Sequence, residues 1–141
     1  MDVYVDTSIL GAYYCPEPLS LKADKVMQAI ANPVISMLTE VEFFSLVAKK
    51  RRQRDFSEAK AKKIQDEFLA HTANGYYGRV AMTVDHYLKA RDMIAQLKTT
   101  LRTLDAIHLA IALQEKLPLI SADEGLIAAA RYFKVKATLV S

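Results

Sequence analysis

Four acidic residues stand at positions where a small α/β domain brings carboxylates together. Asp6 and Asp123 each follow a short apolar stretch, whereas Glu42 and Asp105 each lie early in a predicted helix. Two unit charges about 5 Å apart at an effective dielectric of about 20 repel by roughly 3 kcal/mol, so four convergent carboxylates call for a cation between them. All-oxygen ligands favour Mg²⁺ or Mn²⁺. The pattern therefore indicates a carboxylate site for a hard divalent cation.

Helix capping is the alternative interpretation for three of these acids. Asp6, with Thr7 and Ser8 after it, suits the start of a helix, and so does Asp123. Glu42 follows Thr39 at the spacing of a capping box, in which the Glu side chain bonds back to the cap. No single one of these acids therefore decides between a structural and a functional role.

Two glutamates compete for one role in the helix predicted after residue 38. Glu40 and Glu42 point roughly 200° apart on a helix, so only one of them can face a given site. We assign Glu42 to the site on the family resemblance described below, and we expect Glu40 to lie in solvent.

Asp105 is the most informative acid. Asp105 and His108 are the only polar residues between Leu104 and Leu113, and a helix that is apolar on nearly all sides is a buried one. A buried carboxylate without a partner costs several kcal/mol, so this one favours a functional role. We expect His108 to be a packed, hydrogen-bonded residue outside the catalytic set.

Short apolar stretches alternate with helical patterns along the chain. Strands are predicted at 3–5, 34–37, 79–83, 119–121 and 137–140. Helices are predicted near 9–12 and at 20–31, 39–52, 57–71, 84–98, 103–116 and 123–133. This alternation predicts one α/β domain over residues 1–141, with a small parallel sheet covered on both faces. Ligands of such sheets bind beyond the carboxyl ends of the strands, where the strand order reverses.

Composition limits the class of protein. The chain has 141 residues and a formal charge of +3, which permits a nucleic-acid partner. Its single cysteine excludes an internal disulfide and a Cys-based zinc site. There is no signal-peptide pattern at the start and no apolar run of about 20 residues, so we expect a cytoplasmic protein that does not enter the membrane.

A basic run follows the helix predicted at 39–52. Its cations are also favourable at the end of a helix, where they interact with the helix dipole. The alternative is a surface that binds the phosphates of RNA. The candidate RNA-binding residues are Lys49, Lys50, Arg51, Arg52, Arg54 and, close to Asp105, Arg102.

Four segments resemble PIN-domain nucleases, in family order and over nearly the whole chain. They are Val3 to Leu10, Ile35 to Glu42, Leu104 to Ala110, and Leu119 to Asp123 followed by Leu126. The compact length resembles the VapC toxins of toxin–antitoxin pairs. Ser121 stands where many relatives carry Thr, which keeps the hydroxyl, and residues 53–77 match no motif.

The resemblance implies a three-layer α/β/α fold and a Mg²⁺- or Mn²⁺-dependent endoribonuclease that leaves a 5′-phosphate and a 3′-hydroxyl. Asp6, Asp105 and Asp123 would bind the metal, and Glu42 would bind it through water or activate the water. Thr7 and Ser121 would orient the carboxylates or the metal-bound water. A homodimer and a VapB-type antitoxin that covers the site are also implied. A housekeeping RNA-processing nuclease and a non-catalytic RNA- or protein-binding module are the alternatives.

Overall fold

The computed structural model describes residues 1–141 and contains five strands and seven helices. The strands are β1 (Asp2–Val5), β2 (Asn32–Ser36), β3 (Gly78–Val80), β4 (Leu119–Ser121) and β5 (Ala137–Leu139). The helices are α1 (Thr7–Tyr14), α2 (Ser20–Ala29), α3 (Met37–Arg52), α4 (Glu58–Ala73), α5 (Val84–Ala95), α6 (Thr103–Gln114) and α7 (Glu124–Tyr132).

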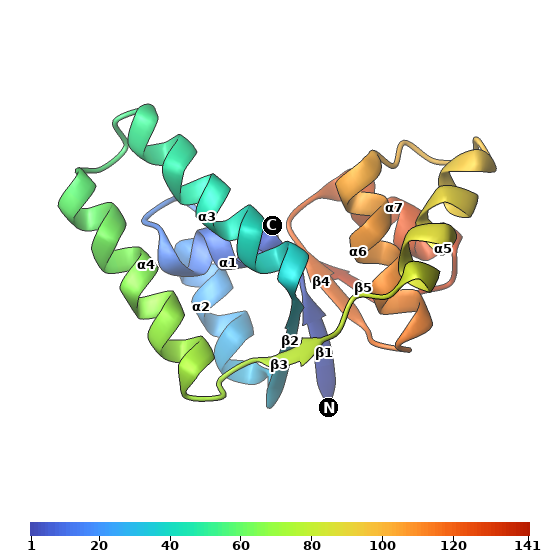
Figure 1. Ribbon diagram of the computed structural model, residues 1–141, viewed down its shortest axis with the longest axis horizontal. Coiled ribbons are helices and arrows are strands. Elements are labelled where there is room, and N and C mark those ends of the chain that lie inside the picture. Colours follow the sequence, from blue (N-terminus) through green and yellow to red (C-terminus); the bar gives the residue numbers. More distant parts are fainter.

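The five strands form one parallel sheet in the order β3-β2-β1-β4-β5. The chain first builds outward from β1 through β2 to β3, and then returns to add β4 and β5 on the other side of β1 (Figure 1). The strand order therefore reverses between β1 and β4. In a parallel sheet, this reversal opens a crevice at the carboxyl ends of those two strands.

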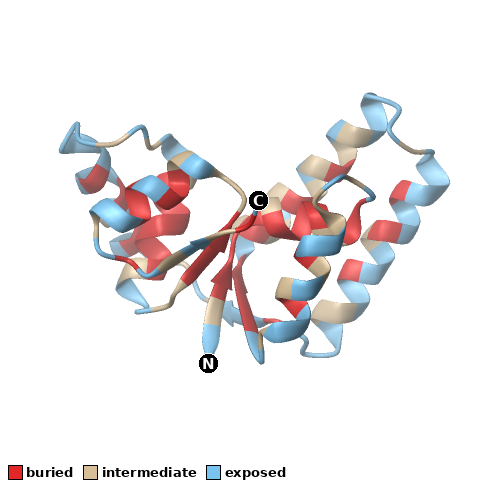
Figure 2. Cartoon of the chain, turned by 180° about the vertical axis from the view of Figure 1, so that it is seen from behind, coloured by how far each residue is buried: buried red, intermediate tan, exposed pale blue.

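Alternate strand residues face opposite layers of helices. Tyr4 packs with α5, α6 and α7, whereas Val5 packs with α1 to α4. Leu119 and Ile120 divide in the same way. Since successive side chains of a strand point to opposite faces, β1, β2 and β4 each contribute to two buried clusters, one on either side of the sheet (Figures 1 and 2). The predicted three-layer α/β/α fold with a small parallel sheet is confirmed.

The start of α3 differs from the prediction. The helix begins at Met37, and Ser36 caps it by accepting a hydrogen bond from the Thr39 backbone N–H. The Thr39 side chain bonds back to the Ser36 backbone N–H, which completes the capping box. The capping role proposed for Glu42 is therefore wrong, and its carboxylate lies one turn further along the helix.

The helices α4 and α5 differ in which residues they bury. In α5, Tyr87, Leu88 and Ile94 are exposed, whereas His86, Ala90 and Met93 are buried. In α4, Ile64 and Phe68 are buried, whereas Leu69 is exposed.

None of the helices is both long enough and apolar enough to span a bilayer.

Candidate active site

Asp6 and Asp123 lie at the carboxyl ends of adjacent strands, β1 and β4. Ser121, the last residue of β4, joins them, because its Oγ donates to Oδ2 of Asp6 at 2.8 Å and accepts from the Asp123 backbone N–H at 2.9 Å. Ser121 is fully buried, and Asp6 is 6% exposed. The hydroxyl at position 121 thus holds one acid and orients the backbone of the other.

A cavity of about 380 Å³ opens beside these strand ends. It is lined by Glu42, Arg102, Thr103, Leu104, Asp105 and Asp123. Three of the four predicted acids therefore share one cavity. Asp6 is the buried fourth and is linked to this group through Ser121.

The acids act on one another electrostatically. Burial raises the pKa of Asp105 above its ordinary value, and the charges of Asp123 and Asp6 raise it further. Glu42 adds to this effect, and His108 opposes it. Because charge–charge effects of this kind require short separations, the four carboxylates form one electrostatic group.

Asp123 has a second role as a helix cap. Its Oδ1 accepts a hydrogen bond of 3.0 Å from the Leu126 backbone N–H at the start of α7. The interpretation of Asp123 as a helix cap is therefore correct. One oxygen of the carboxylate is used by the cap, and the residue still lines the cavity.

Asp6 occupies the N-cap position of α1 without capping it. Its side chain bonds to no backbone N–H of that helix. Instead, Oδ2 accepts hydrogen bonds from Ser8 Oγ at 2.6 Å and from Ser121 Oγ at 2.8 Å. Two hydroxyl donors fix the carboxylate at the strand end, which is the behaviour expected of a functional acid.

Glu42 is held by donors from two other helices. Thr7 Oγ1, in α1, donates to Oε1 of Glu42 at 2.7 Å, and His108 Nε2, in α6, contacts the same oxygen. Burial by itself would raise the pKa of Glu42, but the hydrogen bonds and charge of His108 and the hydrogen bond of Thr7 lower it below its ordinary value. Glu42 is therefore ionised at neutral pH.

The sequence interpretation missed two residues of this site. Ser8 donates to Asp6 and accepts from the Ala122 backbone N–H at 3.0 Å, so it ties the loop after β4 to the loop after β1. His108 is packed and hydrogen-bonded, as expected, but its contact with Glu42 was not predicted. It is fully buried. The signal for His108 was its position one turn after Asp105 on an otherwise apolar helix.

Glu40 lies outside the site. Its Oε1 is 3.0 Å from Arg79 Nη2 on β3, and the side chain is only 13% exposed. The expectation that Glu40 lies in solvent is therefore wrong, whereas the choice of Glu42 as the acid that faces the cavity agrees with the geometry.

A groove of about 580 Å³ runs from the acids along α3. Glu42, Ser45, Lys49 and Gln53 line it, a spacing that places them on one face of that helix. Lys50 also lines the groove and lies 3.8 Å from Glu17 and 4.0 Å from Asp55. Beyond it, Arg51, Arg52 and Arg54 are exposed at the end of α3. The basic residues therefore lie at the end of α3 that is further from the acidic cavity, and the groove connects the two.

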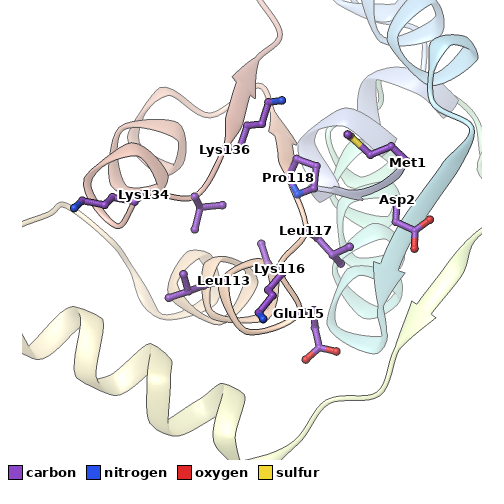
Figure 3. Close-up of a pocket in the computed structure, with 11 residues that line it drawn as sticks. Met1, Asp2, Leu113, Glu115, Lys116, Leu117, Pro118, Lys134 and Lys136 are labelled. Atoms are coloured by element: carbon purple, nitrogen blue, oxygen red, sulfur yellow. The ribbon is translucent and has the colours of Figure 1, made fainter.

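A third cavity, of about 680 Å³, lies at the opposite end of the sheet. Its lining comes from the amino ends of β1, β4 and β5 and from the end of α6, and includes Asp2, Glu115, Lys116, Lys134 and Lys136. The three lysines point in different directions (Figure 3). Glu115 is engaged by His86, at 3.3 Å. No group of polar side chains converges there as the acids do at the carboxyl ends.

The donor set fits a hard cation. In this structure no three His, Cys, Asp or Glu side chains form a ready metal-binding cluster. The donors around the cavity are nonetheless carboxylate oxygens, the ligand type that Mg²⁺ and Mn²⁺ prefer. Burial is the main cause of the raised pKa of Asp105, and the charges of Asp123 and Asp6 add a repulsion that a bound divalent cation would remove.

A model of the PIN domain matches residues 3–132, which is most of the chain. The chain belongs to the PIN domain family. The resemblance inferred from the four segments is thereby confirmed. No curated protein matches the chain in sequence.

Solved structures share this fold over most of the chain. FitAcB of Neisseria gonorrhoeae is 18% identical, with a TM-score of 0.72 over 97% of this chain and 96% of that one. VapC20 of Mycobacterium tuberculosis, described as a sarcin–ricin loop cleaving toxin, is 16% identical, with a TM-score of 0.72 over 90% and 94%. A toxin–antitoxin complex from Klebsiella pneumoniae is 21% identical, with a TM-score of 0.62 over 89% and 90%. At these identities the neighbours show the fold alone.

Proposed function

We propose that this PIN domain is an endoribonuclease whose cleavage requires Mg²⁺ or Mn²⁺. The observation that carries the proposal is the convergence of the acids: Glu42, Asp105 and Asp123 line one cavity, and Ser121 joins buried Asp6 to them. A group of mutually repelling carboxylates at the carboxyl end of a parallel sheet is costly to maintain without a cation. Membership of the PIN family and the basic run at the end of α3, which begins with Lys49 in the groove, support the same activity.

In this proposal Asp6, Asp105 and Asp123 hold the cation. Thr7 orients Glu42, and Ser121 orients Asp6. When bound, the cation supplies Lewis acidity, which neutralises charge on the phosphate and makes water more acidic.

The other residues act on the substrate and the water. Glu42, ionised and with Oε2 free of hydrogen bonds in the chain, accepts a proton from the attacking water or binds the cation through water. Arg102 lines the cavity and is exposed, so its guanidinium pairs with the scissile phosphate. Lys49 and the arginines beyond it bind the phosphates of the flanking strand.

We further propose that the chain is the toxin of a VapBC-type toxin–antitoxin pair. The fold is shared with a toxin described as cleaving the sarcin–ricin loop and with a toxin–antitoxin complex, and the chain covers nearly all of both lengths. A VapB-type antitoxin would be the protein partner, covering the acidic cavity and the groove.

A homodimer is part of this proposal, supported by the outer face of α5. Val84, Tyr87 and Leu88 are spaced to share one face of that helix and are 72%, 52% and 41% exposed. Apolar groups gathered on a surface in this way mark interaction sites. Sedimentation velocity of the wild type and of Tyr87→Glu tests it: a dimer that dissociates in the variant is expected, and a monomeric wild type would contradict it.

Cleavage of RNA by the purified chain tests the nuclease. We expect cleavage with Mg²⁺, none with EDTA, and a loss of about 1000-fold in Asp6→Asn and Asp105→Asn, because each variant removes a charge that holds the cation. Glu40→Gln is the matched control, since it removes an acid that is paired with Arg79 outside the cavity. Full Mg²⁺-dependent activity in Asp105→Asn, or equal activity of the wild type with EDTA, would contradict the proposal. Metal-free RNA binding without turnover would favour the non-catalytic module.

Brief induction in cells separates the toxin from a housekeeping nuclease. A toxin arrests growth within minutes of induction, the Asp105→Asn variant does not, and co-expression of the antitoxin restores growth. Sequencing of RNA ends after induction identifies the cleaved RNA and the cleavage position. Normal growth at high levels of active protein would leave the nuclease in place and reject the toxin.

A further inference from the structure

A chain of buried polar side chains lies behind Glu42. His108, Tyr4, Ser36 and Thr39 are each fully buried. His108 Nε2 contacts Oε1 of Glu42, and its Nδ1 is 2.7 Å from the hydroxyl of Tyr4. The Tyr4 hydroxyl is in turn 2.8 Å from Ser36 Oγ and 3.3 Å from Thr39 Oγ1. These contacts connect the site to the core strands β1 and β2.

The hydrogen-bond partners assign the protons along this chain. Burial raises the pKa of Tyr4 to about 12, so its phenol keeps a proton to donate. Ser36 Oγ accepts from the Thr39 backbone N–H, which leaves its own proton for Tyr4. If Tyr4 donates to Nδ1, the proton of His108 that faces the site lies on Nε2, where it donates to Glu42. The side-chain polar atoms of His108, Tyr4, Ser36 and Thr39 then all have hydrogen-bond partners.

The consequence for Glu42 is a fixed carboxylate with one free oxygen. Thr7 and His108 both bond to Oε1, and no group of the chain bonds to Oε2. Glu42 lines both the acidic cavity and the groove beside it. The hydrogen bonds therefore hold one oxygen and leave the other for the substrate side.

A purely structural role explains this arrangement poorly. The residues that flank His108 in α6 are apolar and buried, and Tyr4 belongs to the same apolar cluster, so Leu at position 108 and Phe at position 4 would fill the same space. Buried polar groups carry a desolvation cost that only complete hydrogen bonding offsets. This series of polar side chains carries that cost, and it ends on a carboxylate of the site.

We propose that His108 and Tyr4 are positioning residues, which orient Glu42 for the cleavage reaction by fixing the tautomer and the direction of the imidazole. This inference rests on the proposed nuclease function and goes beyond it by naming residues that touch neither substrate nor metal. Partners that support metal-site carboxylates and imidazoles typically change activity by 10- to 100-fold when they are removed.

Tyr4→Phe is the decisive variant, and Tyr14→Phe is its matched control. Tyr14 is a buried tyrosine whose hydroxyl also bonds a histidine and a second hydroxyl, His71 Nδ1 and Tyr77 OH, each at 2.6 Å, on the other side of the sheet. We expect Tyr4→Phe to lower kcat by about tenfold with KM within about twofold, and Tyr14→Phe to leave both unchanged. Equal kcat in the two variants, or a loss that only follows the unfolded fraction, would overturn the proposal.

The state of His108 supplies a readout that needs neither metal nor RNA. Nitrogen NMR of the metal-free protein should show His108 with its proton on Nε2, and Tyr4→Phe should shift the Nδ1 resonance, because that nitrogen loses its hydrogen-bond donor. A wild-type imidazole with no proton on Nε2 would overturn the proposal, as would an unchanged Nδ1 resonance in Tyr4→Phe. If the wild type cleaves no RNA, the proposed nuclease function is refuted. The NMR measurement then still shows whether Tyr4 and His108 hold Glu42.

A conservative replacement adds a third comparison. His108→Gln keeps an amide N–H that reaches toward Glu42, whereas His108→Leu fills the space without a donor. We expect His108→Gln to retain about tenfold more activity per folded molecule than His108→Leu. Equal activity in the two would overturn the proposal.

Discussion

Ser121, at the end of β4, donates a 2.8 Å hydrogen bond to Asp6, at the end of β1. The two residues are 115 positions apart in the chain, yet the reversal of strand order between β1 and β4 makes them neighbours. The same hydroxyl accepts from the Asp123 backbone, so one buried side chain aligns two of the four acids. The topology of the sheet, rather than any local motif, assembles the site.

Asp105→Asn should stabilise the metal-free protein at neutral pH. Burial and the charges of Asp123 and Asp6 raise the pKa of Asp105 in the folded state above its ordinary value of 3.8. An acid with a raised folded-state pKa costs no stability below that ordinary value, and the cost appears as pH rises through the folded-state pKa. The Tm of Asp105→Asn in EDTA should therefore exceed that of the wild type at pH 7, with the difference shrinking toward pH 4.

Mn²⁺ should reverse this order at pH 7, because the cation binds the wild-type carboxylate and not the amide. Thermal denaturation at both pH values, with EDTA and with Mn²⁺, checks the prediction. A lower Tm for Asp105→Asn in EDTA at pH 7 would show that the repulsion is absent.

Two substitutions at Asp123 should separate its two roles. Asn caps helices about as well as Asp, so Asp123→Asn should keep the hydrogen bond to the Leu126 backbone N–H and lose only the charge. Asp123→Ala loses both, and should cost about 1 kcal/mol in the free energy of unfolding. Cleavage should fall in both variants, whereas urea denaturation should distinguish them. If Asp123→Asn cleaves RNA as the wild type does, its role is capping alone.

Reversing the charge of Lys49, Arg51 and Arg52 should weaken RNA binding and reduce its dependence on salt. For a single strand, each lost phosphate contact lowers the slope of log K against log salt by about 0.7, so three lost contacts lower it by about 2. Fluorescence anisotropy with a labelled RNA over a range of salt concentrations measures this slope.

The matched control reverses Lys116, Lys134 and Lys136, which line the cavity at the other end of the sheet. The net charge changes equally, so the general attraction of RNA to the protein changes equally too. An identical drop in slope in both triple variants would show that Lys49, Arg51 and Arg52 make no specific contacts with RNA.

The sheet and its acids were predictable because they depend on simple patterns. Strands with both faces buried are short apolar runs, and Tyr4-Val5 and Leu119-Ile120 show that each face has its own core. Asp6 and Asp123 follow such runs directly, which places them at the carboxyl edge once the sheet is parallel. Asp105 was visible as a carboxylate in an apolar helix.

Other features depend on tertiary contacts that the sequence does not display. The sequence offers two overlapping capping boxes at the start of α3, Ser36 with Thr39 and Thr39 with Glu42. Because β2 ends at Ser36, the helix begins directly after it and the first of these capping boxes forms. His108 resembles an ordinary buried histidine until α3 brings Glu42 to it, 66 positions away. The helix α5 packs against α6 and buries His86, Ala90 and Met93, so Tyr87, Leu88 and Ile94 lie outside.

Calorimetric titration of the metal-free protein with Mn²⁺ tests most directly whether the acids at the carboxyl ends of β1 and β4 share one cation. We predict saturable binding to the wild type and to Glu40→Gln, with the affinity lost in Asp6→Asn and Asp105→Asn while both remain folded. Wild-type protein that binds no Mn²⁺, or an Asp105→Asn variant that binds it as tightly as the wild type, would contradict the account.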